Sequence, residues 1–523
     1  MVQYLDNNNS GFAAWNANRN NTAKKGKLGG FLWWFVIFMA AWYAMGLMFG
    51  KKTDTVPAND TTVAVVDVSN VPVQEIASDK ITANVQGLRI SNVSLKDFQE
   101  SAKSDETVKL LAGENAYAEI GVVGVGTTAP TADTAWTVNG ETYTWRNTDG
   151  VVFNRTVAVD DYVIIINDEI KNDSKKDFSF TPYARIQREK DNTSSAGVYT
   201  GLVVYANKDI EHDDWRALAK KPRAYTTVNG FMGFADQYWE TVVDIDVPDQ
   251  TIRAQKYGDI YQSDVSARAV NVAAGESVDV QTYMYAGPRD SSALRGAEQH
   301  ISGIDKTIDY GWFWFLAMPM LWLINAINAI VMNYGVAIII MTILLRLLMW
   351  PLTRKSYTSM AAMQKMQPEM QRIQKLYAND KQRMQMEMMK LYQTHKTSPM
   401  SGCLPMLIQI PIFFALYKAL LISVQMRNAH FLWISDLAVM DPYFILPILM
   451  GLSMWVQQRL QSNVKKSADK NDVAAQTQRA MRWMPIIFTV MFAWMPAGLV
   501  LYWTVSNLFG ILQMYIIKRK ISK

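Results

Sequence analysis

The sequence lacks the residues on which disulfides, metal centres and most active sites are built. Cys403 is the only cysteine among 523 residues, so no intrachain disulfide can form. The four histidines are dispersed along the chain, and neither H-E-x-x-H nor G-x-S-x-G occurs in it. We therefore expect no catalytic residue, no metal site and no cofactor, and we expect the protein not to be an enzyme.

Charge is scarce as well. Charged residues make up 19% of the chain, whereas soluble proteins carry about a quarter. The net charge of +5 is small for this length and does not suggest sequence-specific binding of nucleic acid. The basic residues stand in short blocks beside apolar runs, which is the placement that orients membrane proteins. This distribution indicates an integral membrane protein.

The first apolar segment reads GGFLWWFVIFMAAWYAMGLMF from residue 29. It is long enough to cross a hydrocarbon core of about 30 Å. The alternative, a cleaved signal peptide, would have a shorter apolar core followed by a small-residue cleavage site, but Lys51 and Lys52 follow here. We predict an uncleaved transmembrane anchor at residues 29–50 behind a cytoplasmic tail at residues 1–28.

From about residue 53 to 290 the pattern changes to period two, within a predicted outer domain at residues 51–308. Runs rich in Val, Ile, Thr and Tyr are separated by turn signals such as Asn139-Gly140, Asp149-Gly150 and Asn229-Gly230. The most prominent runs cover residues 61–68, 157–168, 197–206 and 242–247. This pattern is typical of an antiparallel all-β domain of sandwich type. A polar helical linker is expected at its C-terminal end, from about residue 288.

Charge decides how the next two apolar stretches, 309–333 and 334–352, are placed. Residues 353–400 are rich in lysine and arginine, so the positive-inside rule places them in the cytoplasm as a helical hairpin. Because the N-terminal tail is also cytoplasmic, only one further crossing fits before this hairpin. We predict that 334–352 crosses, and that 309–333 lies on the outer membrane surface as an amphipathic helix.

The remaining segments follow in order. Spans are predicted at 401–425, 442–461, 483–496 and 498–517, with a cytoplasmic loop at 462–482 and a basic cytoplasmic tail at 518–523. The expected fold is a polytopic α-helical membrane protein with six spans, five of them forming a core, and an all-β sandwich-type domain outside. Both termini are then cytoplasmic, and residues 51–333 lie on the outer, periplasmic side.

Arg346 is a charged residue in the middle of a predicted span, where insertion costs about 2.5–3.5 kcal/mol. No Asp or Glu occurs within the predicted spans to neutralise it. Such residues usually face water or a partner, but Arg346 could also extend to the cytoplasmic interface. Lys418 is similarly deep in its own span, so depth does not separate the two cations.

Other polar residues lie in the predicted spans. Interhelical hydrogen bonding is their ordinary role, but together with Arg346 they could line one polar cavity. They are Thr342, one turn before Arg346, and Gln409, Ser506, Asn507 and Gln513.

The cytoplasmic hairpin is unusually rich in methionine. Methionine is flexible and polarisable, and suits surfaces that bind varied apolar partners; the alternative is that these side chains pack the two helices together. The candidates for a docking surface are Met363, Met366, Met370, Met388 and Met389.

Several motifs resemble the YidC branch of the Oxa/Alb family of membrane insertases. They are YMYAGPRD (283–290), LLRLLMWPLTRKSYTSMAAMQKMQPEMQ (344–371), GCLPMLIQIPIFFALY (402–417) and MPAGLVLYWTVSN (495–507). The resemblance covers at least residues 283–517, and the large outer domain is similar to the type found in the inner membrane of Gram-negative bacteria. It implies an insertase and chaperone for membrane proteins, whose five core spans enclose a hydrophilic groove open to the cytoplasm and to lipid.

The resemblance also implies site residues and partners. Arg346 would make the groove positive and wet, Thr342 would line it, and Trp503 stands where the family usually has a tyrosine. The implied partners are nascent membrane proteins, the lipid bilayer, the Sec translocon with its accessory subunits, and the ribosome and a targeting receptor at the basic cytoplasmic regions. An anion transporter or channel remains the alternative, although no inverted repeat is evident.

Overall fold

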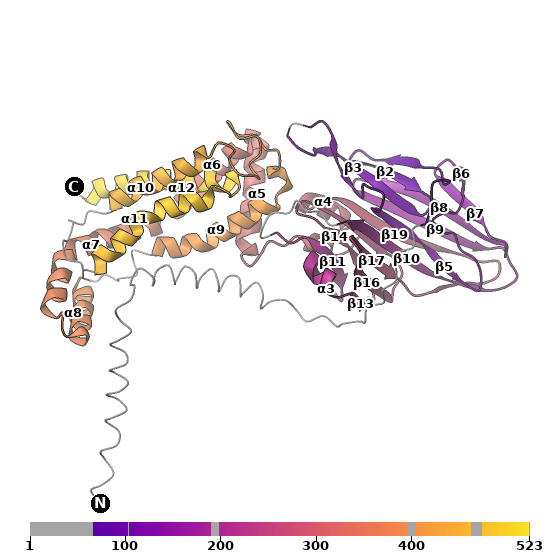
Figure 1. Cartoon of the computed structure of the whole chain (residues 1–523), viewed down its shortest axis with the longest axis horizontal. Helices are drawn as coiled ribbons and strands as arrows, with labels where there is room; N and C mark the ends of the chain where they lie inside the picture. Colours follow the sequence, from indigo (N-terminus) through magenta and orange to yellow (C-terminus); the bar gives the residue numbers. More distant parts are fainter. Residues whose placement is uncertain (1–65, 103, 190–197, 396–403, 462–472, 522–523) are drawn as a thin grey trace, which may run out of the picture.

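The computed structural model describes residues 66–102, 104–189, 198–395, 404–461 and 473–521. A helical bundle and a β domain lie end to end in it (Figure 1). The predicted tail and anchor at residues 1–50 lie outside the described residues, as does part of the predicted loop 462–482.

The β domain is built of two antiparallel sheets. The first sheet has ten strands. In order across it they are β1 (Gln74–Ala77), β2 (Ile81–Gln86), β3 (Arg89–Gln99), β5 (Tyr117–Val125), β10 (Phe178–Glu189), β17 (Ile260–Ser266), β16 (Gln250–Tyr257) and β13 (Arg223–Thr227), with β4 (Thr107–Leu110) beside β3 and β18 (Val270–Val272) beside β10.

The second sheet has nine strands. In order across it they are β12 (Asp209–Asp214), β11 (Gly201–Ala206), β14 (Phe231–Ala235), β15 (Trp239–Ile245), β19 (Ser277–Pro288), β9 (Val163–Asn172), β8 (Val151–Asp160), β7 (Thr142–Arg146) and β6 (Thr137–Asn139). A short helix, α3 (Trp215–Lys220), follows β12, and the side chain of Asp214 caps its N-terminus.

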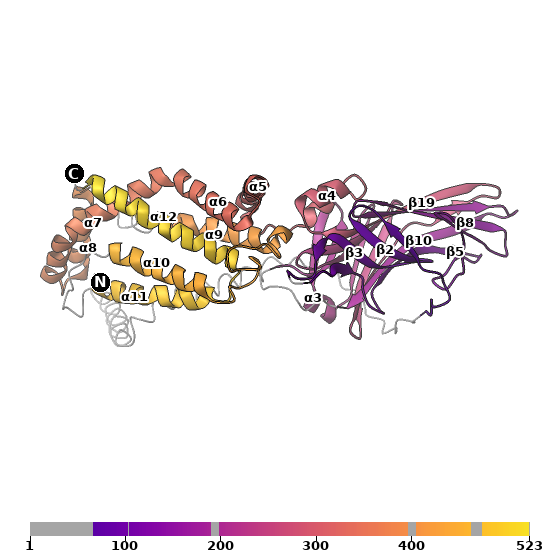
Figure 2. The ribbon, with the colours of Figure 1, turned by 90° about the horizontal axis from the view of Figure 1, so that it is seen from above.

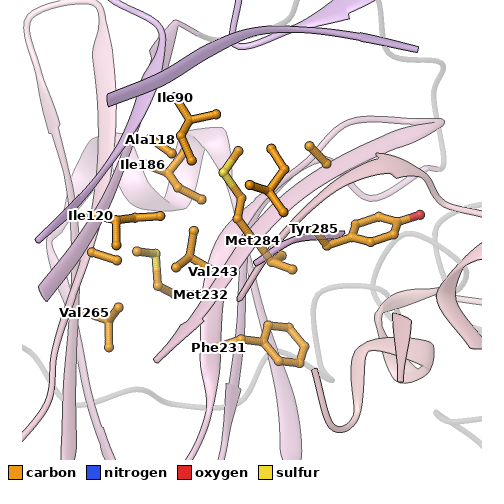
Figure 3. Packing of buried hydrophobic residues seen from close by; sticks show 14 of the residues in the cluster. Ile90, Ala118, Ile120, Ile186, Phe231, Met232, Val243, Val265, Met284 and Tyr285 are labelled. Carbon is orange, nitrogen blue, oxygen red and sulfur yellow. The ribbon is translucent and has the colours of Figure 1, made fainter. Parts of the chain in front are cut away.

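The core of this domain lies between the sheets. In β2, Ile81, Ala83 and Val85 are buried and alternate with less buried residues, as one inward face of a strand requires. Figure 3 shows side chains of the first sheet, such as Ile120 and Ile186, near side chains of the second, such as Met232 and Met284. The predicted all-β sandwich is confirmed.

Two of the predicted turns are confirmed, whereas two of the predicted strand runs differ from the structure. Gly140 and Gly150 adopt φ values of 63° and 97° between successive antiparallel strands, β6 to β7 and β7 to β8. The run 157–168 is not one strand but the hairpin of β8 and β9, which turns at Asp161 (φ 49°). The end of the run 61–68, residues 66–68, is not a strand.

The linker out of the β domain is held by a buried ionic network. After β19 come α4 (Ser291–Ala297), capped by Asp290, and the short 3₁₀ helix η1 (Ile304–Thr307). Arg289 lies 3.4 Å from the carboxylate of Glu240 in β15, and the Thr307 hydroxyl donates to the same carboxylate at 2.9 Å. Arg289 also donates to the carbonyl of Thr307 at 2.6 Å. Both ends of the linker are thereby fixed to one strand.

The bundle is formed by helices from the C-terminal part of the chain. They are α5 (Trp314–Val331), α6 (Tyr334–Leu348), α7 (Trp350–Leu376), α8 (Lys381–Thr394), α9 (Leu404–Ile422), the 3₁₀ turn η2 (Val424–Met426), α10 (Ile445–Gln461), α11 (Val473–Phe492) and α12 (Ala497–Ile521). Helix α12 packs against α6 and α10, and α11 packs against α10. Helix α5 packs on α6 and α9 and runs crosswise to the bundle (Figures 1 and 2).

Within the described residues, fewer helices than predicted meet the length and composition of a membrane span. Among the described residues, two helices are long and apolar enough to cross a membrane, α5 and residues 497–519 of α12, or three with the bent pair α6 and α7. Residues 408–422 and 482–492 form shorter apolar helices. Six spans are therefore not confirmed. The crosswise direction of α5 fits the predicted surface helix, and its placement relative to a membrane stays a prediction.

Several helix boundaries differ from those predicted. The stretch 334–352 ends as a helix at Leu348, and the chain bends by 61° into α7. Pro351 in the first turn of α7 explains a helix start there, because proline fits the first turn of a helix but has no N–H to continue the hydrogen bonds of α6. Helix α11 begins at Val473, inside the predicted loop 462–482.

We expect Arg289→Ala to destabilise the β domain, because it leaves a buried carboxylate without its cation. Burial raises the pKa of Glu240 to about 7, although Arg289 and the Thr307 hydroxyl both lower it. A raised folded-state pKa means that the stability Glu240 contributes is complete below its unfolded pKa and is lost as pH rises through about 7. The loss caused by Arg289→Ala should therefore be about 3 kcal/mol at pH 8 and smaller at pH 5.

Thermal unfolding of the full chain in detergent at the two pH values measures this difference. Arg268→Ala is the control, because Arg268 forms an exposed ion pair with Asp249 at 3.3 Å, with 63% and 57% of the two side chains exposed. An equal loss from Arg289→Ala at both pH values would remove the electrostatic explanation.

Candidate functional site

Arg346 lies in the last turn of α6 and points toward α12. Its Nε donates to the hydroxyl of Ser506 at 2.8 Å, and a second guanidinium nitrogen contacts the same oxygen. The backbone carbonyl of Arg346 accepts a hydrogen bond of 3.2 Å from Gln513. No carboxylate of the described residues lies within ion-pair distance of Arg346. The guanidinium is thus held by a neutral acceptor and keeps its full positive charge.

A small cavity lies beside Arg346 between four helices. Its free volume is about 20 Å³, which is enough for about one water molecule. Its lining residues come from α6, the bend, α7, α9 and α12; they are Thr342, Leu345, Arg346, Met349, Leu352, Thr353, Gln409, Ile412 and Tyr502. The predicted cluster of polar residues around Arg346 is therefore formed in part, and the bend at Met349 closes one side of it.

Thr342 and Gln409 both line this cavity, but each is already hydrogen-bonded. The Thr342 hydroxyl donates to the carbonyl of Ile338 in its own helix at 2.6 Å. The side-chain amide of Gln409 donates to the hydroxyl of Tyr502 at 2.6 Å, which joins α9 to α12. Gln513 contacts Arg346 from farther along α12. These bonds order the cavity wall around the one charged group.

Trp503 and Asn507 lie on a different face of α12. Trp503 packs in an aromatic cluster with Phe413, Phe488 and Phe492, with ring centroids 5.1, 6.0 and 5.2 Å away. Asn507 donates to the hydroxyl of Ser453 in α10 at 3.2 Å. Neither residue lines the cavity at Arg346.

The aromatic side chain in the cavity is Tyr502, which the sequence analysis did not select. Tyr502 precedes Ser506 by four residues and therefore shares its helical face. A helical-wheel projection of α12 around Ser506 would have identified Tyr502 on the same face. The motif comparison pointed to position 503 instead, one residue and about 100° farther around the helix.

Lys418 differs from Arg346 in its partner. Its ammonium group lies 2.6 Å from the carboxylate of Asp309, at the end of the linker. Burial raises the pKa of Asp309, but the charge and hydrogen bond of Lys418 outweigh this effect, so the pKa is lowered overall. Lys418 is therefore neutralised in an ion pair that joins α9 to the linker, whereas Arg346 is not neutralised.

The loop after α9 also contacts the β domain. The guanidinium of Arg427 donates to the backbone carbonyls of Gln99 and Glu100 and lies 5.5 Å from the ring centre of Trp239. The amide of Gln237 donates to the carbonyl of Leu421 at 3.1 Å. With the pair of Lys418 and Asp309, these bonds connect the β domain to the end of the bundle at which α5 lies.

The methionines of the hairpin are divided between packing and exposure. Met366 is buried, whereas Met389 is 59% exposed. Met363, Met370 and Met388 are partly buried. Some of these methionines therefore pack the hairpin and others are exposed, and a docking role for the exposed ones stays a prediction.

No described residues form a group of three or more His, Cys, Asp or Glu that could hold a metal ion. Within the same part of the chain, the cavity at Arg346 contains no nucleophile paired with a base. Its chemistry is that of a fixed positive charge beside hydroxyl, amide and apolar groups.

The chain matches two family models and many curated proteins. The model described as "YidC periplasmic domain" matches residues 74–323, and "60Kd inner membrane protein" matches residues 326–523. "Membrane protein insertase YidC" of Magnetococcus marinus is 37% identical over 78% of this chain and 76% of its own. The protein of the same name from Mesorhizobium japonicum is 34% identical over 90% of this chain and 84% of its own.

Substitutions at the two neighbouring aromatic residues separate their roles. We expect Trp503→Ala to lower bundle stability by about 3 kcal/mol, because it leaves a space among three phenylalanines. Tyr502→Phe should cost only about 1 kcal/mol, the contribution of its hydrogen bond with Gln409. Thermal unfolding of the purified full chain measures both. A larger loss from Tyr502→Phe than from Trp503→Ala would contradict the assigned packing.

Proposed function

The chain belongs to the YidC family of membrane protein insertases, and from this we propose that it inserts membrane proteins through a positively charged cavity that opens to the cytoplasm and to lipid. The cavity is the one at Arg346, between α6, α7, α9 and α12. The observation that carries the proposal is that Arg346 is held by the Ser506 hydroxyl and not by a carboxylate. Its charge is therefore available to a passing chain.

The charge would attract the acidic or polar tail of a substrate part of the way into the bundle. Partial entry shortens the apolar distance that the tail must cross and so lowers its desolvation cost. The free volume of about 20 Å³ admits no peptide, so the helices around it must separate for a tail to enter. The bend between α6 and α7 and the contact of Gln409 with Tyr502 are where we expect this opening.

The substrate's apolar helix would then move into lipid along α9 and α11. Large apolar side chains of α11 face outward, among them Ile487 and Val490, which are 46% and 54% exposed, and Trp494 in the turn after α11 is 68% exposed. Burial of the substrate helix in lipid supplies the driving force, and the membrane potential acting on tail charges adds to it. No nucleotide takes part in this scheme.

The proposed setting is the cell inner membrane, with both termini in the cytoplasm and the β domain in the periplasm. Helix α5 would lie in the outer interface, where its exposed Trp314 and Trp322 suit the headgroup region. The proposed partners are nascent membrane proteins, the Sec translocon with its accessory subunits, and, at the basic cytoplasmic regions and the methionine-rich hairpin, the ribosome and a targeting receptor.

The alternative function is an anion transporter or channel, because an unneutralised arginine in a bundle could bind an anion. Liposomes containing the purified chain distinguish the two functions. Insertion of a substrate protein without flux of chloride or phosphate supports the insertase. Anion flux without insertion would support the transporter.

We expect Arg346→Ala to impair insertion of substrates with acidic tails more than of matched substrates with neutral tails. The difference should be about fivefold, because one charge pair contributes about 1 kcal/mol even in water. Arg346→Lys should retain more activity than Arg346→Ala, since it keeps the charge. Protease protection of the inserted tail in proteoliposomes gives the measurement.

Arg354→Ala is the matched control, because it removes an exposed arginine eight residues farther along the chain, in α7. It should leave the ratio of acidic to neutral substrates unchanged. Equal losses of both substrate classes in Arg346→Ala would remove the electrostatic role of Arg346 while leaving the family assignment intact.

A further inference from the structure

A second groove lies between α10 and α11. It shares no helix with the cavity at Arg346 and is larger, with a volume of about 320 Å³, within the range of small-molecule sites. Its lining residues are Gly451, Trp455, Arg482, Trp483, Pro485, Ile486 and Thr489. All but Arg482 and Thr489 present apolar surface, so the groove has apolar walls and one cationic side chain.

The groove results from the way the two helices pack. They pack tightly at Gly451, where an added Cβ would lie 1.9 Å from the hydroxyl oxygen of Thr489, so any larger residue would force the Thr489 side chain to shift. That hydroxyl is already bonded to the carbonyl of Pro485 at 2.8 Å. Beyond the contact, Trp455 and Trp483 are 40% and 63% exposed, and line the groove instead of filling the bundle core.

Positive charge gathers at one end of this groove. Arg482 is exposed and has no hydrogen-bond or ion-pair partner among the described side chains. Arg459, one turn after Trp455, places its guanidinium 4.3 Å from the centre of that ring. Lys518 of α12 donates to the carbonyl of Leu460, so the C-terminal end of α12 adds to the same basic end. Tryptophan and arginine at one level are typical of a membrane interface.

We propose that this groove binds one anionic phospholipid. Its acyl chain lies along Ile486 and Trp483, and its phosphate lies between Arg482 and Arg459. A guanidinium beside an apolar groove complements a ligand that joins an anion to a hydrocarbon chain. A zwitterionic headgroup carries its own cation and is attracted less. The site belongs to the leaflet at the basic end of the bundle, and the proposal does not depend on how substrates enter.

Native mass spectrometry of the full chain in detergent tests the site, with phosphatidylglycerol and phosphatidylcholine of identical acyl chains as probes. The wild-type chain should retain phosphatidylglycerol in preference to phosphatidylcholine. Arg482→Gln should lower phosphatidylglycerol affinity about fivefold, the effect of one basic side chain at an anionic surface. Arg354→Gln removes an exposed arginine of α7 with the same change in net charge, and should leave the preference unchanged.

A second variant tests the apolar wall. Ile486 is 55% exposed, so Ile486→Trp should fill the groove without disturbing the bundle core, and lower the affinity for both lipids. Equal effects of Arg482→Gln and Arg354→Gln would overturn the proposal, since only general attraction to basic residues would remain. Equal retention of the two lipids by the wild-type chain, or no effect of Ile486→Trp, would also overturn it.

Discussion

The buried pairing of Arg289 with Glu240 is the interaction on which the relation between the two halves of the molecule depends. It joins the end of β19 to β15, and the Thr307 hydroxyl closes the network from the far end of the linker. A buried charge needs a partner in a defined geometry, so this network leaves the linker little freedom. Asp309 follows two residues after Thr307 and is thereby brought to Lys418 of α9. One buried pair in the β domain thus sets where the bundle is attached.

Inside the bundle, α12 has an equally central position. One face, with Tyr502, Ser506 and Gln513, contacts Gln409 and Arg346. The adjoining face, with Trp503 and Asn507, packs on aromatic residues and on α10. The polar and apolar faces of one helix therefore separate a polar cavity from an apolar core. A hydroxyl acceptor at Ser506 orients the guanidinium without cancelling its charge, which a carboxylate at this position would do.

Much of this arrangement could be predicted from the sequence, because local patterns determine it. Period-two runs rich in Val, Ile, Thr and Tyr, separated by Asn-Gly or Asp-Gly turns, predicted the β sandwich, and apolar runs predicted the helices of the membrane part. The bend at Met349 was missed because an apolar run continues through it, although Pro351 was a signal. The hairpin within 157–168 was missed because its turn contains no glycine. The ion pair of Lys418 was missed because Asp309 lies outside the predicted spans, and pairing across segments is not a local property.

The crosswise direction of α5 has a consequence for bilayer thickness. With α5 in the outer interface, α6 begins at that level with Tyr334, and Arg346 lies about 18 Å deeper at the rise of an α-helix. In a hydrocarbon core of about 30 Å this leaves about 12 Å to the opposite surface. Because the position of α5 fixes the depth of Arg346 below the outer surface, a thicker or thinner bilayer changes only the distance from Arg346 to the opposite surface. Hydrophobic mismatch would then change the apolar thickness on only one side of Arg346. Lipid chain length would therefore alter the distance that the tail of a substrate must travel to reach Arg346.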